Sequence, residues 1–366
     1  MMRTIEINLE AIAANYETLK KLTEAKVMAI VKADAFGHGM IEVSKKLESI
    51  GVDMLATADL EEAQNIRAAG IASPLLAWLH GEGADFESAI KNDIQIGFSS
   101  VAGLEQVAAA ARKISSVAKL HLKVDTGLGR NGATLAEWPS VIGKAIELRN
   151  QGLVELVGVF SHLSGTSEKD DMVQLAEFET AVEAARKLGA EFEYRHLAAS
   201  AATLNYKNTH LDMVRVGIAL YGLDPNPETV AASFGLIPAM RVSAEVVSVK
   251  QVPAGHGVSY GYLHKTSEPT TLALVPFGYA EGLPRIATGK ARVLLNGKRY
   301  LLSSRIAMDQ FVLDVGNDKV SIGDEVVIFG DAKKGEPTAE ELADASETIN
   351  YEIVTRIGGR AKRVFK

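Results

Sequence analysis

The sequence predicts an α/β protein: an N-terminal (β/α)8 TIM-type barrel followed by a mostly β C-terminal domain. Eight short apolar runs alternate with longer amphipathic segments between residues 10 and 235. That number matches the eight strands of a closed parallel barrel, although an open doubly wound sheet would show the same alternation. From residue 236 to 366 the chain instead alternates apolar and polar residues around turn dipeptides. We therefore expect domains at 10–235, the barrel, and 236–366, the β-rich domain, which the strand at 1–9 could also join.

The predicted barrel strands are short runs rich in β-branched and aromatic residues, as buried parallel strands require. They lie at 27–31, 54–58, 74–79, 94–98, 120–124, 156–160, 192–196 and 213–220. The segments between them place apolar residues three and four positions apart, which predicts helices. These lie at 41–50, 60–69, 101–114, 141–149 and 172–188.

The second domain is predicted mainly from alternation and turn residues. The stretch 241–251 alternates valine with polar residues and predicts one half-exposed strand. The Asn296-Gly297 turn predicts a hairpin over 293–300. A second hairpin is expected at 320–329, and a single helix at 338–346. The strand at 5–9 could pair with either domain.

Composition excludes several classes of function. The chain has no cysteine among its 366 residues, which excludes thiol catalysis and cysteine-bound metals. Its net charge of −7 disfavours nucleic-acid binding. The charged N-terminus lacks the apolar core of a secretory signal, and no run is long enough to span a membrane. We expect a cytoplasmic protein with no nucleic acid, membrane or metal partner.

Polar residues gather where the predicted strands end, and in barrel enzymes this end carries the chemistry. They are Lys32, Lys123, Asp125, Arg130, His162, His196, Ser200, Arg215 and Gly217. Each has a plain structural alternative. Lys32 could be solvated at the rim, Lys123, Asp125 and Arg130 could form a local ion-pair network, and we favour a core role for His196.

A lysine beside several cations in an apolar pocket indicates a particular chemistry. Such an amine has a lowered pKa and can form a Schiff base with an aldehyde. Backbone N–H groups around Ser200, Gly217 and Ile218 could hold a phosphate. Together these features point to pyridoxal phosphate, which needs both a lysine and a phosphate cradle.

Several segments of the chain resemble those of a known protein family. The segment AIVKADAFGHG at 29–39 is similar to the pyridoxal-lysine signature of alanine racemases. Further blocks resemble the family in the same order: KVDTGLGRNG, FSHLSG, HLAASAA, MVRVGIALYGL, GVSYG, PFGYAEG, SSRIAMDQ and INYE. The resemblance spans nearly the whole chain. It implies reversible racemisation of L-alanine and D-alanine on a pyridoxal phosphate aldimine, supplying D-alanine for peptidoglycan.

The resemblance also implies roles for individual residues. Lys32 would be the Schiff-base lysine and one base, and Tyr260 of the partner subunit would be the opposite base. The remaining implied roles concern binding. For the cofactor, Arg215 would bind the pyridine nitrogen with His162 beside it, and the phosphate would be held by Ser200, Gly217, Ile218 and Tyr351. For the substrate, Arg130 and the partner's Met308 would bind the carboxylate, and Tyr279 and Tyr351 would narrow the entrance. Lys123 would be the position that is carbamylated in many relatives.

The implied assembly is a homodimer whose active sites are shared between subunits. Without the resemblance, Tyr260 would be taken as a tyrosine packing in a β loop. One departure concerns the cofactor: Phe36 replaces the family's usual tyrosine, so one hydroxyl contact to the phosphate should be missing.

Three alternatives remain. The nearest is a pyridoxal phosphate racemase of broader preference, acting on serine or basic amino acids. A pyridoxal decarboxylase of similar architecture would typically need a cysteine, which this chain lacks. A non-catalytic pyridoxal-binding protein would resemble the barrel alone.

Overall fold

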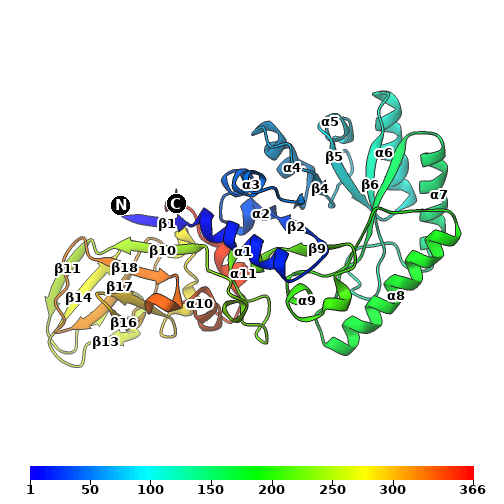
Figure 1. Cartoon of the computed structure of the whole chain (residues 1–366). Helices are drawn as coiled ribbons and strands as arrows, with labels where there is room; N and C mark the ends of the chain where they lie inside the picture. Colours follow the sequence, from blue (N-terminus) through cyan, green and yellow to red (C-terminus); the bar gives the residue numbers. More distant parts are fainter.

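The computed structural model describes residues 1–366 and contains a closed barrel of eight parallel strands beside a β-rich region (Figure 1). The barrel strands follow one another around the ring, and β9 closes it by pairing with β2. They are β2 (Lys26–Ile30), β3 (Met54–Thr57), β4 (Leu75–Ala77), β5 (Ile94–Phe98), β6 (Ala118–Lys123), β7 (Val154–Phe160), β8 (Tyr194–His196) and β9 (Met213–Val216). The predicted fold class is confirmed, and the open-sheet alternative is excluded.

Helices cover the outside of the barrel (Figure 1). They are α1 (Leu9–Lys21), α3 (Met40–Ser49), α4 (Leu60–Ala68), α5 (Phe86–Lys91), α6 (Val101–Lys113), α7 (Trp138–Asn150), α8 (Glu168–Lys187) and α9 (Ser200–Asn205). Several begin at an Asp or Ser whose side chain accepts a backbone N–H of the first turn, such as Asp59 and Ser167. The six-residue helices α5 and α9 were not predicted, because less than two turns shows no clear periodicity.

The β-rich region is built around one six-stranded sheet of order β16-β15-β18-β10-β1-β19. Its strands are β1 (Arg3–Ile7), β10 (Met240–Glu245), β15 (Arg292–Leu295), β16 (Lys298–Leu301), β18 (Glu325–Phe329) and β19 (Lys362–Phe365). The N-terminal strand β1 lies between β10 and β19, so both chain ends belong to this sheet (Figure 1). The pairing left open for the strand at 5–9 is therefore with the C-terminal sheet.

Smaller elements complete this region. A three-stranded sheet contains β11 (Ser248–Val252), β14 (Thr270–Val275) and β17 (Phe311–Gly316), and β12 (Gly257–Val258) pairs with β13 (His264–Lys265). Two helices follow, α10 (Ala339–Ala345) and α11 (Asn350–Arg356). Short 3-10 helices lie at Lys207–Thr209, Ile218–Tyr221, Ala231–Phe234, Tyr260–Tyr262, Tyr279–Glu281, Arg285–Ala287 and Ala332–Lys334.

Four predicted elements were wrong in detail. The strand expected at 241–251 is two strands, β10 and β11, which belong to different sheets. The expected hairpin at 320–329 is one strand, because β18 pairs with β10 and β15 rather than with a neighbour in sequence. The last barrel strand was predicted to reach residue 220 but ends at Val216. The C-terminal region was predicted to have one helix but has a second, α11. Long-range pairing decides the arrangement of β10 and β18, and Gly217 follows the end of the last barrel strand.

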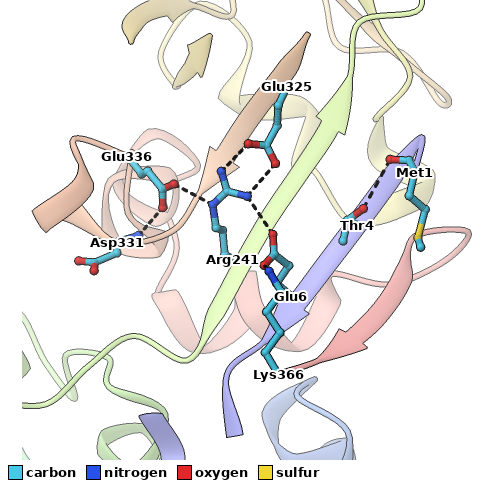
Figure 2. A network of polar contacts seen from close by, with 8 residues as sticks. All are labelled: Met1, Thr4, Glu6, Arg241, Glu325, Asp331, Glu336 and Lys366. Carbon is cyan, nitrogen blue, oxygen red and sulfur yellow. Dashed lines mark hydrogen bonds and ion pairs between the residues drawn. The ribbon is translucent and has the colours of Figure 1, made fainter. Parts of the chain in front are cut away.

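Arg241 joins the strands around the chain ends in one polar network (Figure 2). Its guanidinium bonds Glu6 on β1 at 3.0 Å, Glu325 on β18 at 2.7 Å and Glu336 at 2.7 Å. Lys366 also pairs with Glu6. The network therefore ties the first strand, the last residue and the middle of the sheet together.

No helix of the structure combines the length and apolar character needed to cross a bilayer.

Candidate active site

A cavity of about 310 Å³ opens at the carboxyl end of the barrel strands. Its wall combines residues at the ends of the first, third, fifth, sixth, seventh and eighth barrel strands with one residue of α11. The lining residues are Ile30, Lys32, Phe36, Trp78, Lys123, Arg130, Phe160, His162, Ala199, Ser200, Arg215, Gly217, Ile218 and Tyr351. The structure thus brings together nine of the residues predicted for the site. It also adds the aromatic residues Trp78 and Phe160, which the strand-end search for polar groups did not consider.

The cavity holds four cationic side chains without a carboxylate partner. Lys32, Lys123, Arg130 and Arg215 line it, and none forms an ion pair within the chain. The ion-pair network considered for Lys123, Asp125 and Arg130 does not form. Asp125 instead accepts the backbone N–H groups of Gly127 and Gly129 at 3.0 and 3.1 Å. Lys123 and Arg215 are buried, and because uncompensated charge is costly to bury, this arrangement favours an anionic ligand.

Lys32 begins the short helix α2 (Lys32–Phe36), whose backbone is unusual. Residues 33–36 all have φ between 51° and 54°, a left-handed turn that costs about 1–2 kcal/mol per residue. Glu62 supports the turn by accepting the Ala33 N–H at 2.5 Å and the Ala58 N–H at 3.1 Å. Burial and the Arg130 charge lower the pKa of the Lys32 amine, which raises its neutral, nucleophilic fraction.

Lys123 shares this environment at the end of β6. Burial lowers the pKa of its amine to about 8, with the positive charges of Arg215 and Arg130 acting in the same direction. Its ammonium group lies 5.6 Å from the centre of the Phe160 ring. The amine is therefore partly neutral near physiological pH.

One part of the cavity wall has hydrogen-bond donors suited to a phosphate. Ser200 Oγ accepts the N–H groups of Gly217 at 3.0 Å and Ala219 at 3.3 Å, which leaves its own proton free to donate. The Ile218 N–H has no acceptor within the chain. A Cβ at Gly217 would lie 2.9 Å from the Phe36 ring, so glycine keeps this space open. The Tyr351 hydroxyl donates to the Pro225 carbonyl at 3.2 Å and lies at the same wall.

Arg215 is held by neutral acceptors. Its terminal nitrogens donate to the Ser161, His196 and Leu197 carbonyls at 2.7–3.0 Å and to the ring nitrogens of His196 and His162 at 3.0 and 3.1 Å. Its Nε–H donates to no group of the chain. Burial, followed by the charge of Arg215, lowers the pKa of His162 well below its usual value, so this ring is neutral.

Three predicted residues lie outside this cavity. Tyr260, Met308 and Tyr279 have exposed fractions of 71%, 54% and 42%. Tyr260 lines a separate surface depression with Ala307 and Gln310. Within one subunit the structure therefore does not join these residues to Lys32.

The loop that carries Tyr260 is nevertheless well held. Ser259 Oγ donates to the Arg305 carbonyl at 2.7 Å, and the His264 ring bonds the Asp314 carboxylate at 2.7 Å. The Met308 N–H, like that of Ile218, has no acceptor within the chain. An ordered tyrosine and a free N–H at the surface are suited to a partner.

The chain matches two family models that together cover most of its length. Residues 7–225 match the model of the alanine racemase N-terminal domain, and residues 239–365 match that of the C-terminal domain. The chain belongs to the alanine racemase family. Two curated alanine racemases, from Frankia casuarinae and Salinispora arenicola, are 46% and 44% identical to this family member. The alignments cover 98% and 97% of this chain and 94% and 95% of those proteins.

Solved alanine racemase structures share the whole architecture. The enzyme from the D-cycloserine producer Streptomyces lavendulae superposes with a TM-score of 0.98 at 45% identity, covering 100% of this chain and 97% of that one. The alanine racemase of Streptomyces coelicolor gives 0.97 at 42% identity, with 100% and 98% covered. The family resemblance inferred from the sequence motifs is confirmed.

Proposed function

We propose that this protein interconverts L-alanine and D-alanine with pyridoxal phosphate held in the barrel cavity. The observation that carries the proposal is the cavity itself: a half-buried lysine with a lowered pKa lies among three further cations, none paired with a carboxylate of the chain. A phosphate and a substrate carboxylate would supply the missing negative charge. When bound, pyridoxal phosphate provides an aldehyde for the substrate amine and an electron-poor ring that weakens the substrate Cα–H bond.

The chain's own residues would bind and orient these groups. Ser200, Gly217 and Ile218 are suited to the phosphate, and the free Nε–H of Arg215 is suited to the ring nitrogen. Because an arginine does not give up its proton, Arg215 would donate a hydrogen bond without protonating that nitrogen. Arg130 would bind the carboxylate from the side of Lys32.

Racemisation requires proton transfer on two opposite faces. The Lys32 amine would hold or release a proton on one face, and the hydroxyl of the partner subunit's Tyr260 would do so on the other. This assignment is supported by the exposure of Tyr260 and by the free N–H of Met308, which would serve the substrate carboxylate across a homodimer interface. D-Alanine formed in this way would be available for peptidoglycan.

The test is to incubate the protein and pyridoxal phosphate with L-alanine and to resolve the enantiomers over time. We expect approach to an equal mixture, and no conversion by Lys32→Ala. Lys46→Ala, which removes a lysine on the outer helix α3, is the control and should remain active. Absence of D-alanine with a folded, cofactor-loaded protein would refute the proposal for alanine, and the same assay on serine, lysine and arginine would then test the broader racemase.

A further inference from the structure

A line of hydrogen bonds crosses the inside of the barrel from Arg215 to Gln95. Arg215 Nη1 lies 3.0 Å from His196 Nδ1, His196 Nε2 lies 2.9 Å from His121 Nδ1, and His121 Nε2 lies 2.6 Å from Gln95 Oε1. The four residues come from β9, β8, β6 and β5, and all are buried. A Cβ at Gly158 would lie 2.2 Å from the His121 ring, so the neighbouring strand has a glycine where the ring needs space.

Only one proton order satisfies this line. A guanidinium can only donate, so His196 Nδ1 must accept and the neutral His196 ring must carry its proton on Nε2. That N–H then donates to His121 Nδ1, which places the His121 proton on Nε2 as well. The line must therefore end on an acceptor, and the amide oxygen of Gln95 is that acceptor.

The positions of the histidine ring protons matter because Arg215 lies at the other end of the hydrogen-bond line. Arg215 has no carboxylate partner, and its Nη1 group is held by His196 alone, through the ring and the carbonyl. If His121 carried its proton on Nδ1, then His196 would have to accept at Nε2 and would present an N–H to Arg215. Two donors would then face each other, and the guanidinium would have to move.

We propose that Gln95 is a positioning residue for Arg215, because its amide oxygen ends the hydrogen-bond line that fixes the ring protons of His121 and His196. Gln95 contacts neither the cavity nor the proposed substrate. It acts through two histidines on the residue that would face the cofactor ring. The effect on turnover rests on the proposed function, whereas the proton order does not.

The direct test is nitrogen NMR of the holoenzyme labelled at histidine, with signals assigned by replacing one histidine at a time. We expect both His121 and His196 to be neutral and protonated on Nε2. A proton on Nδ1 of either ring, or a doubly protonated ring, would overturn the proposal. The proton positions are read from the unaltered protein and do not depend on racemisation, and the histidine variants serve only to assign the signals.

Variants at Gln95 test the consequence. Gln95→Met keeps the length but removes the acceptor, and we expect the His121 Nε2–H signal to lose its hydrogen-bonded character and kcat to fall about tenfold, with KM for alanine within about twofold. Gln95→Glu retains an acceptor oxygen and should restore most of the Nε2–H signal. Gln106→Met, at an exposed glutamine on α6, is the matched control. Spectra and kcat of Gln95→Met equal to those of this control would contradict the proposal.

Discussion

At the scale of single residues, the cavity concentrates positive charge that the chain does not neutralise. Lys32, Lys123, Arg130 and Arg215 face one space of about 310 Å³. The acceptors around Arg215 are carbonyls and neutral rings, so its charge is directed to the cavity rather than to a carboxylate. Such a site is suited to anionic ligands, and its burial and positive charge also lower the pKa values of its lysine amines.

The phenyl ring of Phe36 gives the first prediction. The ring lines the cavity beside Gly217, and its centre lies 6.2 Å from that of Tyr351. Phe36→Tyr adds a hydroxyl at the phosphate wall, and one such hydrogen bond contributes about 0.5–1.5 kcal/mol. We expect the Kd for pyridoxal phosphate to fall about two- to tenfold. Phe192→Tyr, outside the cavity, should leave the Kd unchanged; an equal Kd for Phe36→Tyr would mean that the added hydroxyl makes no net favourable contact.

Arg130 gives a prediction about pH. Burial lowers the pKa of the Lys32 amine first, and the Arg130 charge lowers it further. Arg130→Met removes the second cause, so the pKa should rise and the neutral amine should require a higher pH. The rate at which apoprotein captures pyridoxal phosphate, measured against pH, should therefore shift to higher pH. Arg130→Lys keeps the charge and should shift less, and a profile that moves to lower pH in Arg130→Met would contradict the electrostatic coupling.

The residues that line the cavity were easier to predict from the sequence than the residues that hold their side chains in place. Lys32, Lys123, His162 and Arg215 could be found because polar residues at apolar strand ends are rare. Gln95 and His121 lie inside the neighbouring strands β5 and β6, and no local pattern indicates that their side chains meet. Their contact depends on the register between these two strands, which a single sequence does not reveal.

At the scale of elements, the barrel was easier to predict than the sheet. Most barrel strands are followed by an amphipathic helix, so local periodicity indicates most of the barrel. In the C-terminal sheet, β18 pairs with β10 and β15, and β1 pairs with β19 from the other end of the chain. Such long-range pairing leaves no signal in local alternation, which is why 320–329 was wrongly predicted as a hairpin.

Arg241 provides a prediction for these elements. Its guanidinium joins β10 to Glu6, Glu325 and Glu336, and the side chain of Glu336 is only 5% exposed (Figure 2). Arg241→Met would leave three carboxylates close together without their cation. We expect the free energy of unfolding in urea to fall by about 2–3 kcal/mol, below the value for a fully buried pair because Glu325 is half exposed.

The control for this prediction is Arg186→Met on α8. Its ion pair with Glu183 is 70% and 45% exposed, so its loss should change stability by less than about 0.5 kcal/mol. Equal losses for the two variants would contradict a structural role for the Arg241 network.

At the scale of the whole molecule, the single chain separates the groups that the proposed function needs. The cavity contains Lys32, while the proposed opposite base Tyr260 lies with Tyr279 and the free N–H of Met308 at the surface of the β-rich region. A symmetric dimer that places this surface over the partner's cavity would complete both sites at once. This arrangement predicts that the two bases of each site belong to different chains.

Subunit complementation tests that claim most directly. Lys32→Ala and Tyr260→Phe proteins should each be inactive alone, and Tyr262→Phe, in the same loop, should remain active. After the two inactive proteins are unfolded together and refolded, half of the dimers should be mixed, and each mixed dimer should contain one intact site. The account predicts recovery of about a quarter of wild-type racemase activity. No recovery from a mixture shown to contain mixed dimers would mean that Lys32 and Tyr260 do not act across the interface.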